Sequence, residues 1–341
     1  MNALTKLPIE TENPLFGLCL YPGAKEVMEH QQDITWTAQE IPVDKDVHDY
    51  RHVMTEQQLN LATVTLQIFV EIEQKVGDVW EEIGKWYPHS EIDGCCIEIA
   101  RMEKAVHAFF YQKMSDVLNI DPEETTKSQN EIQVLKNKLQ LLRKITSDLG
   151  ADKPLSLATV AMLEQVLLFS NFAMLKSFQS NGNNLIKNTI TGVNFVVQDE
   201  QLHGDFASYL FKTVLAEDQK INSIDKELLK RNIDAVMDEV IAHEEAVIDY
   251  TFSTDMAIND ITSAQLKLFI RSRANSTLEL LGYEPKYVIE ANPIGDWFYR
   301  GSNSIKTHDF FAGITNQYRR AWKLDSFSRL PHMNGADNEQ H

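Results

Sequence analysis

Two pairs of acidic and imidazole side chains recur at helical spacing, and such pairs can bind metal ions. Glu103 precedes His107 by four residues, and Glu200 precedes His203 by three. Residues three or four apart lie on one face of an α-helix, so each pair presents an oxygen and a nitrogen ligand to the same side. A single pair of this kind arises often by chance and usually faces solvent.

Two further glutamates stand alone in apolar stretches. Glu71 follows the apolar run 68–70, and Glu164 lies inside the run 160–168, which leaves little solvent-facing surface. A lone buried carboxylate is costly unless it is paired or bound to a metal. Along the chain the order is therefore a glutamate and then a Glu/His pair, given twice, with similar separations in the two halves.

This ordered set predicts a dinuclear metal centre with two ions per chain. Two divalent ions held close together need bridging carboxylates to offset their repulsion, and each also takes an imidazole nitrogen. Oxygen and imidazole ligands suit iron or manganese better than metals that prefer thiolates. One Glu from each of two helices and a Glu/His pair from each of two others is the di-iron carboxylate pattern of ferritin-like bundles.

The elements that must position these residues are helices. No proline lies between Pro154 and Pro285, and apolar residues recur there at steps of three and four. Thr55 and Gln58 form a capping box, and Gly150 and Gly282 end two helices. The predicted helices are 55–79, 91–118, 131–149, 155–179, 184–216 (with a break near Gly192), 224–252 and 263–281. The fold class is all-α, a ferritin-like helical bundle with additional helices.

The domain division that follows has three parts. Residues 1–34 form an N-terminal segment and residues 35–293 the dimetal helical domain. The helical pattern fades after Pro293, so residues 294–341 are interpreted as a flexible C-terminal tail.

Composition excludes several classes of function. The 341 residues carry a formal net charge of -18, which argues against nucleic-acid and anionic-membrane binding. The N-terminus has no signal-type apolar run, and three cysteines form a poor disulfide framework, so we expect a cytoplasmic protein. The adjacent Cys95 and Cys96 are expected to be buried small apolar residues.

Several segments together resemble the small subunit of class I ribonucleotide reductase. The segment 36–41 (WTAQEI) resembles the family's Trp-x-x-x-Glu-Ile/Val entry, and 292–294 (NPI) its closing Asn-Pro. The segment 198–206 (QDEQLHGDF) resembles its second metal helix, with Gln198 where arginine is usual. The resemblance spans roughly residues 35–318.

The resemblance implies a radical site. Residues 107–111 (HAFFY) match the family's His-x-x-x-Tyr, so Tyr111 would carry the stable tyrosyl radical. A core tyrosine with a satisfied hydroxyl is the structural alternative. The residues implied to form a dry pocket around the radical are Leu168, Phe172 and Val196.

It also implies a route for the radical. Asp199 would link the metal-bound His107 to Trp36, and these three would begin a proton-coupled electron route to the surface. Tyr318, in the C-terminal tail, would pass the radical to a separate large subunit.

One spacing departs from the family. Its first metal helix has Glu-x-x-His, whereas Glu103 lies four residues before His107 and Lys104 occupies the expected position. Either a π-type bulge absorbs an inserted residue, or Lys104 replaces a ligand; we favour the bulge.

The function that follows is that of a ribonucleoside-diphosphate reductase small subunit. Its dimetal site would activate dioxygen and oxidise Tyr111, and the large subunit would reduce ribonucleotides to deoxyribonucleotides. The expected partners are a second copy of the chain and the large subunit. A ferritin-like ligand-binding oxidase would need neither Trp36 nor Tyr318, and a metal-storage protein would need no apolar pocket around Tyr111.

Overall fold

The computed structural model describes residues 7–12, 17–119, 123, 127, 131–252 and 257–299. Over these ranges the chain is all-α, as predicted, and its extended pairing is limited to one isolated bridge between Ile258 and Ile261. The principal helices are α1 (Pro22–Ile34), α2 (Glu56–Gly84), α3 (Ser90–Met102), α4 (Ala108–Leu118), α6 (Gln133–Ser147), α7 (Lys153–Met162), α8 (Phe169–Lys176), α9 (Lys187–Asp218), α10 (Lys226–Thr251), α11 (Ser263–Leu280) and α12 (Pro293–Phe298).

Short π-helical and 3-10 segments join or interrupt these helices. The π-helix η5 (Glu103–His107) joins α3 to α4, and η6 (Leu163–Leu167) joins α7 to α8. A third π-helix, η4, covers Asp49–Val53. The 3-10 segments are η1 (Pro8–Glu10), η2 (Ala38–Glu40), η3 (Val43–Asp46) and η7 (Ser177–Gln179).

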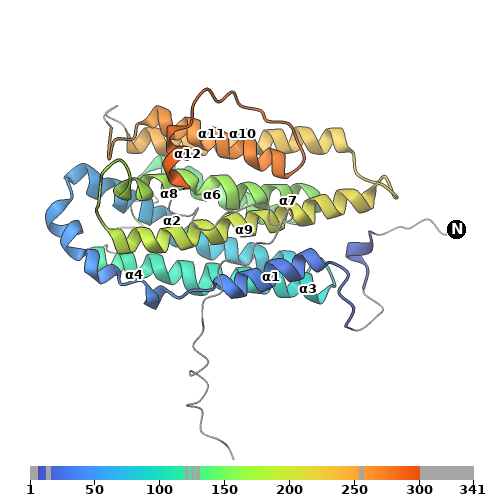
Figure 1. The fold of residues 1–341 in the computed structure, drawn as a ribbon. Helices are drawn as coiled ribbons and strands as arrows, with labels where there is room; N and C mark the ends of the chain where they lie inside the picture. Colours follow the sequence, from blue (N-terminus) through green and yellow to red (C-terminus); the bar gives the residue numbers. More distant parts are fainter. Residues whose placement is uncertain are drawn as a thin grey trace, which may run out of the picture.

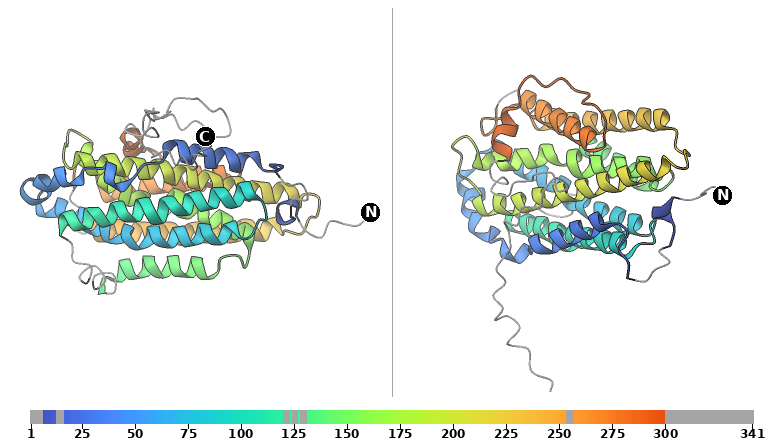
Figure 2. Two further views of the ribbon diagram at one scale, coloured as in Figure 1. Left: turned by 90° about the horizontal axis from the view of Figure 1, so that it is seen from below. Right: turned by 45° about the vertical axis from the view of Figure 1, so that its right-hand side comes forward.

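The bundle is layered around a shared apolar core. Helices α10 and α11 lie along one side, α7, α8 and α9 cross the middle, and α1, α3 and α4 lie along the other side (Figure 1). Helix α2 packs against α3 and α4, and α7 packs against α9. Figure 2 shows α6 at an edge of the molecule, where it contacts α2 and α10. The four segments predicted to carry ligands therefore surround one interior.

The helix start and stop signals predicted from the sequence are confirmed at three helix ends. The Gln58 amide N–H donates to Thr55 Oγ1 at 3.2 Å, while Gln58 Oε1 accepts from the Thr55 backbone N–H at 2.9 Å. Gly150 and Gly282 have φ of +85° and +87°, the left-handed region that favours glycine after a helix.

The predicted break near Gly192 is wrong, because α9 runs through it without interruption. Glycine is needed there for packing. A Cβ at residue 192 would lie 2.4 Å from the Phe110 ring, so α9 approaches α4 more closely than any side chain allows.

The ends of the domain contain more helix than the sequence indicated. Helix α1, inside the predicted N-terminal segment, packs against α3 and α9. Helix α12 continues past Pro293, and its Phe298 ring lies 4.8 Å from Phe269 and 5.9 Å from Phe169 between centroids. The prediction that the helical pattern fades after Pro293 is therefore wrong for five residues, 294–298, whose helix is stabilised by tertiary aromatic packing. The three-part division itself stays a prediction.

One segment, Lys153–Gln179, is long and apolar enough to cross a membrane by composition alone. All of its apolar window is buried inside the bundle, the usual position of a core helix.

Candidate metal centre

Six buried side chains converge between α2, α3–η5, η6 and α9. They form two overlapping groups in which the potential ligand atoms lie within 4.8 Å of one another. We call this set the carboxylate–histidine cluster; its members are Glu73, Glu103, His107, Glu164, Glu200 and His203. Each member is at most 1% exposed.

Two of the carboxylates reach both imidazoles. His107 Nδ1 lies 3.4 Å from Glu103 and 3.1 Å from Glu200. His203 Nδ1 lies 2.8 Å from Glu103 and 3.8 Å from Glu200. Glu103 and Glu200 are thus the carboxylates shared by the two imidazoles.

The other two carboxylates each approach one imidazole. Glu73 lies 3.4 Å from His107 Nδ1, and Glu164 lies 3.9 Å from His203 Nδ1. The geometry therefore divides into two half-sites, each with one histidine and one glutamate of its own, joined by the shared pair.

A π-helical turn sets the first half-site. Glu103 and His107 are the ends of η5, and both are buried in the cluster. The π-type bulge predicted from the four-residue spacing is confirmed. Lys104 turns outward, where its Nζ lies 2.7 Å from both Asp78 and Glu81, so it is not among the ligand candidates.

The carboxylate of α2 in the cluster is Glu73, whereas the sequence analysis named Glu71. The side chain of Glu71 is outside the described ones, although its backbone lies in α2. The role predicted for Glu71 therefore stays a prediction, while Glu73 is the α2 member of the described cluster. Phe69, one turn before Glu73, stacks on Tyr111, and Trp80, two turns after it, donates to Glu164. The stripe 69–73–76–80 is the signal that identifies Glu73.

Each histidine is held from behind by its other nitrogen. His107 Nε2 lies 2.9 Å from Asp199 Oδ2, which also accepts the Trp36 indole N–H at 2.8 Å. This is the His107–Asp199–Trp36 connection implied by the resemblance. Gln31 joins the halves, because its Nε2 donates to Asp199 Oδ1 at 3.0 Å and its Oε1 lies 3.1 Å from His203 Nε2. Such contacts fix ring orientation and leave both Nδ1 atoms facing the cluster.

Gln31 and Trp80 were not found from the sequence. The Trp80 indole N–H donates to Glu164 Oε1 at 2.5 Å and so orients that carboxylate. Gln31 lies on α1, far along the chain from its partners, and no local pattern marks it.

Tyr111 lies in a dry aromatic environment. It is fully buried, and its ring stacks on Phe69 with centroids 4.5 Å apart and planes at 6°. Phe69 stacks in turn on Phe172 at 4.8 Å. Leu168 and Val196, the other implied pocket residues, are also buried. Burial, and then the charge of Glu73, hold the pKa of Tyr111 well above its ordinary value, so the phenol stays protonated.

The donor set fits a pair of divalent cations. Both oxygens of Glu73, Glu103 and Glu200 and the Nδ1 atoms of both histidines are buried and have no hydrogen-bond partner outside the cluster. Burial and then the charge of Glu200 raise the pKa of Glu73 and of Glu164 well above the usual range. Four carboxylates facing two imidazoles carry excess negative charge, which two dications would offset.

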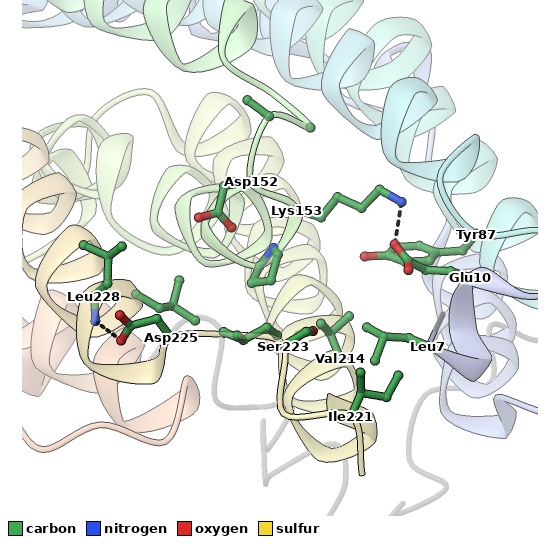
Figure 3. A pocket seen from close by; sticks show the side chains of 15 residues that line it. Leu7, Glu10, Tyr87, Asp152, Lys153, Val214, Ile221, Ser223, Asp225 and Leu228 are labelled. Atoms are coloured by element: carbon green, nitrogen blue, oxygen red, sulfur yellow. Dashed lines mark hydrogen bonds and ion pairs between the residues drawn. The ribbon is translucent and has the colours of Figure 1, made fainter. Parts of the chain in front are cut away.

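A separate cavity lies at one end of the bundle (Figure 3). It has a volume of about 520 Å³ and is bordered by Tyr87, Asp225 and the ion pair between Lys153 and Glu10 at 2.7 Å. The carboxylate–histidine cluster contributes none of its lining. The cluster itself is buried, with each member at most 1% exposed.

Tyr318 and the other residues from 300 to 341 lie outside the described residues. The expectations that concern this tail stay predictions. Cys95 and Cys96 are buried, as predicted, while Cys19 is exposed; all three are free thiols.

A helical bundle with this buried set of four glutamates and two histidines defines a ferritin-like dimetal carboxylate protein. The family model for the small chain of ribonucleotide reductase matches residues 18–293. The chain belongs to that family. As a small-chain member it is an oxidoreductase subunit of ribonucleotide reductase.

Curated relatives span nearly the same length. The chain is 23% identical over 319 residues to a probable ribonucleoside-diphosphate reductase small subunit of Invertebrate iridescent virus 3, covering 88% of this chain and 83% of that protein. It is 25% identical over 292 residues to the subunit beta of ribonucleoside-diphosphate reductase 2 from Escherichia coli, covering 83% and 86%.

Solved structures share the fold. Dimanganese(II)-NrdF of Streptococcus sanguinis superposes with a TM-score of 0.70 at 19% identity, covering 86% of this chain and 99% of that one. The Rnr4 homodimer of Saccharomyces cerevisiae gives a TM-score of 0.68 at 18% identity, covering 84% and 87%.

Proposed function

We propose that the carboxylate–histidine cluster holds two iron or manganese ions and that Tyr111 carries the radical. The observation that carries this proposal is the inward face of the cluster, where eight buried oxygen and nitrogen atoms have no hydrogen-bond partner outside the cluster itself. When bound, the metal pair would supply the oxidising power of dioxygen. The site residues of this proposal are those of the structure, with Glu73 in place of Glu71.

The protein's own residues determine which group is oxidised. Tyr111 loses one electron and its phenolic proton together, because its raised pKa forbids prior ionisation. Its hydroxyl oxygen has no hydrogen-bond partner among the described side chains. The stacked rings of Phe69 and Phe172 exclude water and reductants. This exclusion would lengthen the lifetime of the radical.

The route out of the site follows the hydrogen bonds already in place. His107, Asp199 and Trp36 form a continuous buried connection with links of 2.9 and 2.8 Å. The Trp36 ring also stacks near His107, with centroids 5.9 Å apart. We propose that the radical moves outward along this connection as an electron moves inward from the large subunit, with Tyr318 as a later member.

Electron paramagnetic resonance after metal loading in air tests the radical site. Wild type should show a tyrosyl signal, and Tyr111→Phe should abolish it while retaining two metal ions. Tyr87→Phe is a matched control, since Tyr87 is also 1% exposed or less and its hydroxyl also lacks a partner, but it lies at the end cavity. A persistent signal in Tyr111→Phe would place the radical elsewhere.

Metal identity requires a direct measurement. Oxygen and imidazole ligands accept iron and manganese alike, so the donor set does not decide between them. Anomalous scattering at the two absorption edges, recorded on protein purified from its native host, assigns each half-site.

We also propose that the chain forms a homodimer and docks the large subunit through residues 294–341. A chain shortened after residue 299 should retain the tyrosyl signal yet support no ribonucleotide reduction when the large subunit is added. Loss of the signal itself would contradict the docking role of the tail. Cell fractionation tests the expected cytoplasmic location.

A further inference from the structure

A second aromatic connection leaves the carboxylate–histidine cluster from the Glu164 side. Trp80 donates its indole N–H to Glu164, and its ring stacks on Phe206 with centroids 5.6 Å apart and planes at 21°. Phe206 stacks on Tyr209 with centroids 6.3 Å apart and planes at 17°. Trp80 and Phe206 are fully buried, and Tyr209 is half-buried.

Helix α9 turns this connection outward. His203, Phe206 and Tyr209 follow one another at steps of three, and each such step rotates the side chain by roughly 60° around the helix. Over about 9 Å of helix the row passes from the cluster to the surface. A row at alternating steps of three and four would have stayed in the core.

The outer end of this connection, at Tyr209, lies near one thiol and two carboxylates. Burial raises the pKa of Tyr209, and the nearby Cys19, Glu26 and Glu91 add to this effect. Cys19 is exposed. Glu91 fixes the chain beside it, because its Oε1 accepts the Leu20 N–H at 2.7 Å and the Tyr21 N–H at 2.9 Å.

We propose that Trp80, Phe206 and Tyr209 form an electron relay that carries single electrons from a surface reductant to the cluster, separate from the Trp36 connection. Trp80 and Tyr209 are the oxidisable side chains, and Phe206 is the bridge between their rings. The purpose of the relay rests on the proposed function of the cluster. Electron transfer through the three side chains can nevertheless be observed in metal-free protein.

The electron balance closes with a one-electron reductant of the ascorbate class. Trp80 gives one electron to the cluster side and keeps its indole proton in the hydrogen bond to Glu164. Tyr209 refills Trp80 and releases its phenolic proton to solvent. The reductant then refills Tyr209, which recovers a proton, so the net change is one electron moved inward.

The exposed Cys19 offers a place to start electron transfer with light. A ruthenium polypyridyl maleimide attached there, flashed with an oxidative quencher, becomes a one-electron oxidant beside Tyr209. Cys95 and Cys96 are buried and should not be labelled, which a Cys19→Ser chain would verify. Transient absorption then follows the appearance of an indole radical.

The expected result is an indole radical in both metal-free and metal-loaded chains, absent in Trp80→Phe. Tyr209→Phe and Phe206→Leu should slow its appearance by about tenfold or more, equivalent to about 1.4 kcal/mol in activation free energy. Tyr283→Phe, which alters a half-buried tyrosine with no ring contact to the relay, should leave the rate unchanged. An unchanged rate in Tyr209→Phe and Phe206→Leu, or an indole radical surviving in Trp80→Phe, overturns the relay. A lost tyrosyl signal at Tyr111 would instead concern the proposed function.

Discussion

The substitution Glu73→Gln separates the charge of the cluster from its shape. Gln preserves the size of the side chain and removes one of four negative charges that would balance two dications. One charge pair at about 4 Å contributes about 4 kcal/mol at an effective dielectric constant near 20. The ion nearest Glu73, whose Oε2 lies 3.4 Å from His107 Nδ1, should therefore bind roughly a thousandfold more weakly.

The metal-free protein should respond in the opposite direction. Burial, followed by the charges of Glu200 and Glu103, raises the pKa of Glu73, so the fold gains nothing from its ionised form. Removing that carboxyl should leave metal-free stability equal or higher. Chelator competition measures the loss of metal affinity. Thermal unfolding with and without metal measures whether Glu73→Gln lowers the stability of the metal-bound protein and preserves or raises that of the metal-free protein.

Glu71→Gln is the matched control, since it makes the same chemical change on the same helix. Because Glu73 is the proposed α2 ligand, both ions should bind to Glu71→Gln with wild-type affinity. The reasoning fails if Glu73→Gln retains both ions at wild-type affinity, or if Glu71→Gln releases one.

Three further predictions concern packing and buried charge. Gly192→Ala should destabilise the protein by about 1–3 kcal/mol in urea unfolding, because the new Cβ meets the Phe110 ring; an unchanged midpoint would contradict this. Lys138→Met should cost about 3–5 kcal/mol by leaving Glu244, 2.6 Å from Lys138 Nζ, buried without its cation, and adding Glu244→Leu should restore much of the loss. Burial lowers the pKa of Lys176 from 10.5 to about 7, so the unfolded chain binds more protons above pH 7 and stability should rise with pH. Between about pH 7 and about pH 9 the gain should be about 2 kcal/mol, and Lys176→Met should show a flatter profile.

The helices were predictable because their periodicity and end signals are local. The capping box of Thr55 and the left-handed glycines at 150 and 282 act within a few residues of their positions. The break proposed at Gly192 failed for the complementary reason. Glycine there serves a contact with Phe110 on a distant helix, and one sequence does not distinguish a flexible glycine from a closely packed one.

The cluster was predictable where ligands come in pairs. Glu103 with His107 and Glu200 with His203 constrain each other through helical spacing, and the four-residue interval indicated the π-helix. A single glutamate lacks this constraint: Glu71 and Glu73 both sit among apolar residues, and only the stripe through Phe69 and Trp80 decides between them. Gln31 could not be found, because its role exists only once α1 lies beside α9.

Two of the π-helices, η5 and η6, help to bring several carboxylates together in the core of the bundle. Glu103 and Glu164 each lie in a π-helical segment, η5 and η6, between two regular helices. A π-turn leaves backbone carbonyls without their usual partner, and in η6 the Leu167 carbonyl accepts from Lys138 Nζ at 2.7 Å. The same ammonium group pairs with Glu244, so a buried ion pair between α6 and α10 supports the turn that carries Glu164. The polar contacts of Lys138 therefore offset part of the free-energy cost of placing Glu164 in the core. They also help to orient this ligand before any cation binds.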